Sequence, residues 1–169
     1  ASLIGSASLI TKIYFPRTIL VLSTILAKIV DFVFATIILV VYMIIYQTPI
    51  NFNLLWVIPF FIIQQIFTLG LALFFSASNL LYRDIQYLLS LILVLWFYIT
   101  PVIYPADVVP AQYRILFLLN PMAVIINAYR QTILRGGLPN FTSLTIAFAL
   151  SLITLYLGLS YFKKKKKIF

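Results

Sequence analysis

The sequence lacks most of the side chains on which enzyme chemistry depends. It contains no cysteine, no histidine and no glutamate, and its acidic residues are Asp31, Asp84 and Asp107. These absences exclude disulfide bonds, Cys/His zinc sites, haem ligation, Ser-His-Asp triads and paired catalytic carboxylates close together in the sequence. The sequence therefore predicts no catalytic residues and no metal site.

Glycine is also scarce. The chain has five glycines, and their spacing matches neither the GxxxxGK[ST] nor the GxGxxG nucleotide-binding motif. We therefore expect no cofactor on this chain, and if the protein takes part in ATP-driven work, another polypeptide should carry the ATPase.

Apolar residues, by contrast, are abundant. Of the 169 residues 64% are hydrophobic and 9% are charged, whereas soluble domains are roughly 45–50% apolar and about 25% charged. The mean hydropathy is +1.14. The composition indicates a membrane protein with room for four or five spans of about 20 residues.

The net charge of +9 does not indicate a nucleic-acid partner. Five of the twelve basic residues form the run 163–167, directly after an apolar stretch. A lysine cluster next to a membrane span is typical of a cytoplasmic anchor that meets anionic lipid headgroups. We expect membrane lipid, and not nucleic acid, as the partner of this tail.

Four stretches are apolar enough to cross a membrane: 18–46, 54–77, 85–104 and 141–162. The third is the weakest, because the 14 residues from Tyr87 to Thr100 reach only about 21 Å before Pro101. This span must start near Asp84 or continue past the proline.

Residues 105–137 hold two short apolar pieces, separated by Asn120 and Pro121. Neither piece can span a bilayer, so a pair of helices that enters the membrane from outside and turns back fits better than a crossing. The predicted fold class is all-α: a polytopic bundle of four transmembrane helices with a re-entrant extracytoplasmic helical hairpin at 105–137 and an amphipathic cytoplasmic segment at 9–17.

The distribution of basic residues supports this topology. A cytoplasmic start places eight basic residues inside and three outside, whereas a single crossing by the hairpin region would move the tail 163–169 outside, against the positive-inside bias. The C-terminus is therefore expected in the cytoplasm. The inside group is Lys12, Arg17, Arg83 and the five lysines of the tail; the outside group is Arg114, Arg130 and Arg135.

Two polar pairs interrupt the spans. Lys28 and Asp31 are three residues apart on one helix and can neutralise each other; we interpret them as an intramembrane pair for helix packing or subunit contact, with a coupling-ion site as the alternative. Gln64 and Gln65 are interpreted as interhelical hydrogen-bond partners before solute ligands.

Two further segments have two interpretations each. Trp96, Phe97 and Tyr98 could stack on sugar rings or form an interfacial aromatic belt. The amphipathic segment around 9–20 could anchor the chain to the membrane or press on a soluble partner, and composition does not separate the two.

The motifs, in order, carry a family likeness. LITKIYFPR precedes a span, and YRDIQYLL, FYITPVIYP, VVPAQYR, LNPM and AYRQTILRGGLPN follow before a last span and a basic tail. This pattern resembles the ABC-2 type permeases that export polysaccharides such as O-antigen, capsule and wall teichoic acid. The resemblance runs through essentially the whole chain.

The resemblance implies a permease of the bacterial cytoplasmic (inner) membrane that forms a homodimer and moves a lipid-linked glycan. A separate ABC ATPase subunit would bind ATP and Mg. Segment 9–17 would be the coupling helix, and 105–137 would border the exit of a glycan channel. The implied ATPase-coupling residues are Lys12, Tyr14, Phe15, Pro16, Arg17, Arg83 and Asp84, and the implied residues of the translocation path and its exit are Trp96, Phe97, Tyr98, Tyr104, Arg114 and Arg130.

The chain departs from this family pattern at its start. Family members usually have two spans ahead of the segment that matches Leu9, whereas here eight residues precede it. The first residue is not Met, and no charged signal-peptide region is present. We expect an N-terminally truncated chain that holds four of six spans.

Two alternatives stay open. The same architecture serves ABC-2 permeases for other cargo, such as a drug or another lipid. A membrane-embedded glycan-modifying enzyme using Asp107, Arg114 and Arg130 is the less favoured interpretation, because it would have one carboxylate on the outer side for acid–base work.

Overall fold

The computed structural model describes residues 17–48, 51–81, 84–105 and 108–166. This part of the chain is helical throughout, with no strand assigned in it, so the predicted all-α class is confirmed. The elements are α3 (Arg17–Ile45), the 3-10 helix η1 (Phe52–Trp56), α4 (Val57–Leu81), α5 (Ile85–Ile99), the 3-10 helix η3 (Ala111–Tyr113), α6 (Arg114–Leu119), α7 (Pro121–Ile133) and α8 (Phe141–Lys166).

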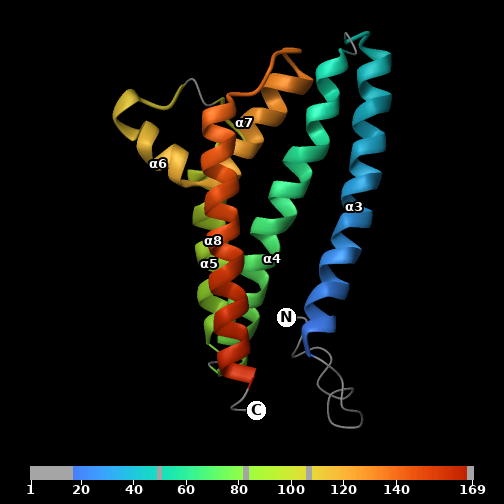
Figure 1. The fold of residues 1–169 in the computed structure, drawn as a ribbon. Coiled ribbons are helices and arrows are strands. Elements are labelled where there is room, and N and C mark those ends of the chain that lie inside the picture. Colours follow the sequence, from blue (N-terminus) through green and yellow to red (C-terminus); the bar gives the residue numbers. More distant parts are fainter. Residues whose placement is uncertain (1–16, 49–50, 82–83, 106–107, 167–169) are drawn as a thin grey trace.

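Three stretches are long and apolar enough to cross a membrane: Val21–Ile45, Phe52–Asn79 and Phe141–Lys164. They correspond to the first, second and fourth predicted spans and run roughly along one another in Figure 1. We call the end of the bundle where α3 ends and α8 begins the upper end, as in that figure, and the opposite end the lower end.

The helix of the third predicted span is short. α5 has 15 residues and reaches about 22 Å. It begins directly after Asp84 and ends at Ile99, because Thr100 takes an extended conformation immediately before Pro101. The helix therefore covers 85–99 and not the whole of 85–104.

α4 and α8 pack most closely, and two glycines allow their backbones to touch. A Cβ atom on Gly158 would lie 2.2 Å from the carbonyl oxygen of Gly70, and one on Gly70 would lie 2.6 Å from the amide nitrogen of Leu155. Small residues at a crossing let the backbones of membrane helices approach in this way. Near the crossing, one buried cluster joins three helices through Val21, Leu73, Ala77 and Phe162.

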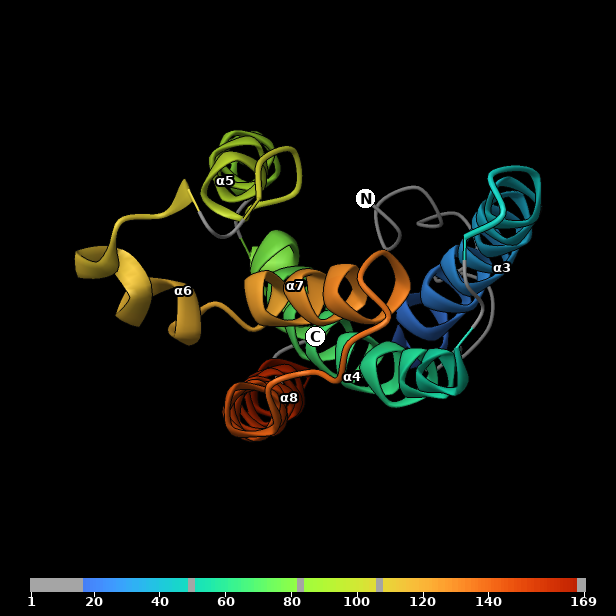
Figure 2. The same ribbon diagram turned by 90° about the horizontal axis from the view of Figure 1, so that it is seen from above.

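A second buried cluster lies higher in the bundle and joins α4, α7 and α8. Its members are Phe60, Ile63, Ile125, Ala128 and Leu144. This cluster places the buried face of the short helix α7 on α4 and α8. Seen from above, α7 crosses the bundle over α4, with α5 and α8 on opposite sides and α6 extending away from α3 (Figure 2).

α5 has a different environment. None of its residues is buried, and every residue from Leu91 to Ile99 is exposed. Its side-chain contact with α4 includes Trp96, whose ring stacks on Phe67 with centroids 6.5 Å apart. Apolar packing among the described residues therefore does little to hold α5.

Candidate functional site at the upper end of the bundle

Asn120 lies in the middle of the segment between α5 and α8, between α6 and α7. This residue is the N-cap of α7: its side-chain oxygen accepts a hydrogen bond from the Met122 amide at 3.1 Å, and Pro121 occupies the first turn. Its amide nitrogen donates to Thr100 Oγ1 at 2.9 Å, and both side chains are buried. A single asparagine thus starts α7 and joins it to the residue that ends α5.

Arg130 on α7 makes a second connection to the same segment. Its guanidinium donates to the carbonyl oxygen of Tyr104 at 2.6 Å and to that of Val102. Tyr104 in turn donates its hydroxyl to the carbonyls of Tyr98 and Ile99, each at 3.1 Å. These are carbonyls of the last turn of α5, which have no partner within the helix. α7 therefore fixes the end of α5 and the segment after it through polar bonds.

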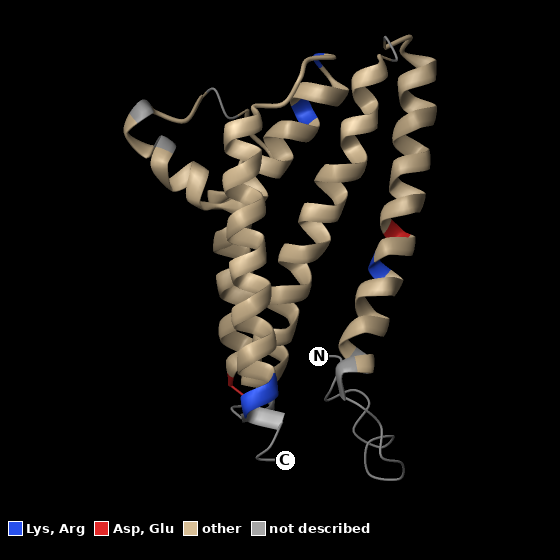
Figure 3. Cartoon of the chain, viewed as in Figure 1, with Lys and Arg blue, Asp and Glu red and all other residues tan. Residues whose placement is uncertain are grey.

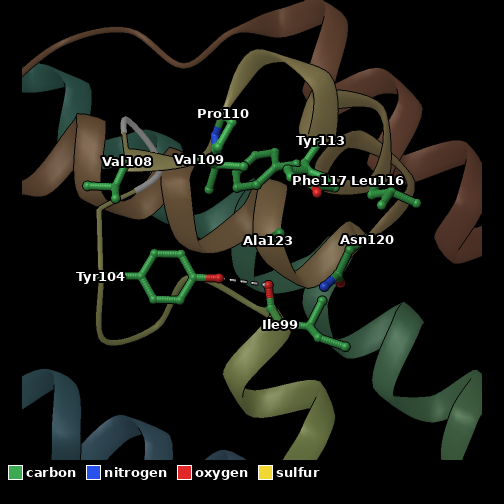
Figure 4. A pocket seen from close by; sticks show the side chains of 10 residues that line it. All are labelled: Ile99, Tyr104, Val108, Val109, Pro110, Tyr113, Leu116, Phe117, Asn120 and Ala123. Atoms are coloured by element: carbon green, nitrogen blue, oxygen red, sulfur yellow. Dashed lines mark hydrogen bonds between the residues drawn. The ribbon is translucent and has the colours of Figure 1, made fainter.

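A cavity of about 330 Å³ lies between these parts. Figure 4 shows the tyrosine ring of the segment after α5 on one side and the aromatic rings around α6 on the other. The wall is mainly apolar, with the Asn120 amide and the tyrosine hydroxyls as its polar groups. The lining residues are Ile99, Tyr104, Val108, Val109, Pro110, Tyr113, Leu116, Phe117, Asn120 and Ala123.

The lining of this cavity determines what it can do. Among the described residues that line it there is no carboxylate, imidazole or thiol, and its hydroxyl groups are those of Tyr104 and Tyr113. Aromatic rings and a few hydrogen-bonding groups are suited to binding a ring-shaped or apolar group.

A larger apolar cavity of about 780 Å³ separates the upper halves of α3 and α4. Its walls include Phe32, Leu39, Met43 and Ile58, and the side chain of Tyr129 reaches it from α7. The tyrosine hydroxyl donates to Gln64 Oε1 at 3.2 Å, which is an interhelical bond of the kind expected for this glutamine. Burial raises the pKa of the Tyr129 phenol above its ordinary value, so the hydroxyl stays protonated and remains a donor.

The four aromatic residues predicted for the path do not form one continuous surface. Trp96 faces α4, whereas Phe97 and Tyr98 are exposed on α5 with 45% and 63% of their surface accessible, and their rings meet edge to face. Tyr104 is the member that lines the 330 Å³ cavity. Of the two arginines assigned to the exit, Arg130 holds the loop after α5, and the side chain of Arg114 lies outside the described residues.

Most of the predicted coupling residues fall outside the described part of the chain. Arg17 begins α3, but its side chain is not described, and Asp84 is exposed at the lower end, where it precedes α5. Lys28 Nζ and Asp31 Oδ2 form an ion pair at 2.8 Å on α3. The residues whose position is not described are Lys12, Tyr14, Phe15, Pro16 and Arg83.

Sequence reasoning missed two structural contacts of this site. The sequence pattern predicts only a break between two apolar pieces at Asn120, although an asparagine before a proline at a helix start is a capping signal. The bond from Asn53 Nδ2 to the carbonyl oxygen of Gly136, 2.7 Å long, joins η1 to the loop after α7. No local sequence pattern predicts that hydrogen bond, because its two residues are 83 positions apart.

Comparison with known proteins places the chain in a family. The chain is 33% identical over 166 residues to the O-antigen export system permease protein RfbA of Klebsiella pneumoniae. These aligned residues make up 98% of this chain and 64% of that protein. It is 28% identical over 163 residues to the protein of the same name from Myxococcus xanthus, covering 95% of this chain and 63% of the relative. The polysialic acid transport protein KpsM of Escherichia coli is 24% identical over 102 residues, which are 60% of this chain and 40% of that protein.

The chain thus spans less than two thirds of the length of these relatives. No solved structure matches it. The model of the family described as ABC-2 type transporter matches residues 7–134, which is more than half of the chain. This chain therefore belongs to the ABC-2 type transporter family of membrane proteins.

Proposed function

We propose that this chain is part of the permease subunit of an ATP-driven ABC exporter that moves a lipid-linked polysaccharide across the bacterial cytoplasmic membrane. The observation that carries the proposal is the similarity to O-antigen export permeases over 98% of the chain. The 330 Å³ cavity with its aromatic wall supports it, because aromatic rings pack against the apolar faces of sugars. The cargo class would be O-antigen, capsule or teichoic acid.

The proposed topology has four crossings, at 18–46, 54–77, 85–104 and 141–162, with 105–137 as re-entrant helices on the outer side. The upper end of the bundle would face outward, and the C-terminus would be cytoplasmic. With the lower end in the cytoplasm, the lysines at the end of α8 (Figure 3) would lie inside, which agrees with the positive-inside bias. α5 would cross together with the residues after it, which Arg130 bonds to α7 and the Tyr104 hydroxyl bonds to the last turn of α5.

The proposed path follows the exposed side of α5 toward the short helices. Trp96, Phe97, Tyr98 and Tyr104 would line it, and Arg114 and Arg130 would stand at its exit. Two permease copies would form the path between them, because the exposed apolar surface of α5 has no partner within the described chain. The ion pair of Lys28 and Asp31 would serve helix or subunit packing on the exposed side of α3.

The energy would come from a separate ABC ATPase subunit that binds ATP and Mg. Segment 9–17 would press on that subunit through Lys12, Tyr14, Phe15, Pro16 and Arg17. Arg83 and Asp84 would lie in the second cytoplasmic connection, near the same interface.

The test uses the full-length permease, expressed with its ATPase in a strain whose own polysaccharide export permease is deleted. Wild-type protein should restore surface polysaccharide, and Phe15→Asp and Arg17→Glu should abolish export while the protein remains inserted in the membrane. Lys164→Glu, a charge reversal on the same proposed side but away from the coupling segment, should export normally. Normal export and normal ATPase stimulation by the two coupling variants would refute the coupling assignment.

A second cargo class has support from one observation. The 780 Å³ cavity between α3 and α4 is almost entirely apolar, and such a cavity suits a drug or a lipid tail better than a sugar chain. If expression of this permease in the deletion strain restored no surface polysaccharide and instead changed drug susceptibility or the distribution of a lipid, the cargo would be a drug or a lipid.

A further inference from the structure

A third cavity, of about 200 Å³, lies where the second half of α7 meets the segment after α5. Asn127, Arg130 and Gln131 face it from α7, where spacings of three and four residues place side chains on one side of a helix. Arg135, which follows α7, also lines it, as do Ile103 and Pro105 of the segment after α5. Unlike the two larger cavities, this one has charged groups in its lining.

The charged residues of its described lining are both arginines. Arg130 is held by the carbonyls of Val102 and Tyr104, which are dipoles without net charge, so these bonds orient the guanidinium without neutralising it. A guanidinium has five N–H donors, so it retains donors beyond the two hydrogen bonds named here. Arg135 has an interaction of its own and is the second basic residue in the lining.

Acidic side chains of the described residues lie far from this cavity. Asp31 is paired with Lys28 in the middle of α3, and Asp84 is at the lower end. Figure 3 shows blue but no red at the end of the molecule where α7 ends. Asp107 lies outside the described residues.

The position of the cavity relates it to the membrane surface. The loop after α7 is bonded to Asn53 at the start of the second spanning stretch, and the last spanning stretch begins at Phe141. Both are span ends, and lipid headgroups lie at the level where spans end. The phosphates of a bilayer are therefore the anions present at this height.

We propose that this cavity binds the phosphate group of an anionic lipid. A guanidinium matches a phosphate in geometry and charge, since it can donate two parallel hydrogen bonds. The carboxamides of Asn127 and Gln131 can donate further bonds without repelling an anion. The volume is below the range of cavities that hold drug-sized molecules, so it suits one headgroup phosphate with the lipid tails outside.

The test retains Arg130, because its loss would also release the loop after α5. Gln131→Glu and Asn127→Asp keep the shape of the side chain and place a negative charge in the cavity. Gln112→Glu is the matched control, because Gln112 is exposed on η3 and lines none of the three cavities.

The reporter is an environment-sensitive fluorophore on a cysteine introduced by Leu134→Cys, at the exposed rim of the cavity. These 169 residues contain no cysteine, and any elsewhere in the full-length permease are replaced first. The purified permease in maltoside micelles is titrated with phosphatidylglycerol, with diacylglycerol of the same tails, and with sodium phosphate.

We expect a saturable response to phosphatidylglycerol and none to diacylglycerol. Gln131→Glu and Asn127→Asp should each weaken the response at least about tenfold, because a like charge in a half-buried site costs more than the ~1.4 kcal/mol that a factor of ten represents. The control should bind as the parent does, and millimolar sodium phosphate should compete with the lipid.

Three results would overturn the proposal. An equal response to diacylglycerol would show that only the tails bind, and saturation by sodium phosphate with no response to the lipid would make the ligand a soluble phosphate. Unchanged affinity in a folded variant, judged by its elution in size-exclusion chromatography, would place the lipid elsewhere. The assay needs neither the ATPase nor export, so its failure would leave the proposed transport function standing.

Discussion

The close crossing of α4 and α8 predicts a large effect from one added methyl group. In Gly158→Ala the new Cβ would lie 2.2 Å from the carbonyl oxygen and 3.0 Å from the carbonyl carbon of Gly70. Both are backbone atoms, so no side-chain rotation can relieve the clash. The helices must separate by roughly 1 Å or more before the contact reaches an ordinary van der Waals distance.

The loss in the free energy of unfolding follows from the disturbed packing between α4 and α8. Inserting a methyl group into a packed interface typically costs 1–3 kcal/mol, and backbone clashes belong at the upper end of that range. Replacing a helical glycine by alanine returns at most about 1 kcal/mol of helix propensity. We expect a net loss of about 2 kcal/mol in the free energy of unfolding, and a similar loss for Gly70→Ala, whose Cβ would lie 2.6 Å from the Leu155 amide nitrogen.

The measurement is unfolding by titration with SDS in mixed micelles, followed by circular dichroism. Gly137→Ala is the matched control, because its Cβ would meet its nearest atom, the carbonyl oxygen of Gln131, at an ordinary 3.7 Å. If Gly158→Ala unfolded at the same SDS fraction as this control, the backbone contact between α4 and α8 would not be a tight one in the membrane protein.

Three further substitutions test the upper end of the bundle by the same measurement. Asn120→Ala should cost about 1–2 kcal/mol, because it removes the N-cap of α7 and the buried bond to the end of α5; hydrogen exchange should rise at the start of α7, and unchanged exchange there would contradict the capping role. Tyr129→Phe should cost only about 0.6 kcal/mol, since it removes the bond to Gln64 but keeps the ring in place; a loss above 2 kcal/mol would mean that the hydroxyl does more than this. Gly136→Ala should destabilise the loop after α7, because Gly136 has φ +62° and a Cβ there would meet the side chain of Asn51 at 2.4 Å; stability equal to the parent would show that the loop adapts.

The sequence predicted the long helices well, because their signal is local. Continuous apolar runs without charge indicate a membrane helix from composition alone, and α3, α4 and α8 begin and end within a few residues of the predicted stretches 18–46, 54–77 and 141–162. The break at Asn120 and Pro121 was also visible as a helix boundary. The crossing by 85–104 and the re-entrant arrangement of 105–137 stay predictions, because α5 is shorter than the stretch assigned to it.

The candidate site was much less predictable. Its shape depends on hydrogen bonds between residues far apart in the sequence: 20 positions from Asn120 to Thr100, 26 from Arg130 to Tyr104 and 65 from Tyr129 to Gln64. Composition and periodicity contain no information on such pairs. The family resemblance assigns Arg130 to the exit of the path, and this role stays a prediction; in the structure the guanidinium donates to backbone carbonyls.

These polar bonds have a further consequence for α5. In lipid, apolar side chains gain little by leaving the tails for another helix, so packing and hydrogen bonds decide where a membrane helix lies. α5 has an exposed apolar surface along its length, and its polar attachments to the rest of the chain converge at its upper end, on Asn120, Arg130 and Tyr104. The position of α5 relative to α7 is therefore set at one end. Because Asn120 also caps α7, a change at this one residue loosens both helices together.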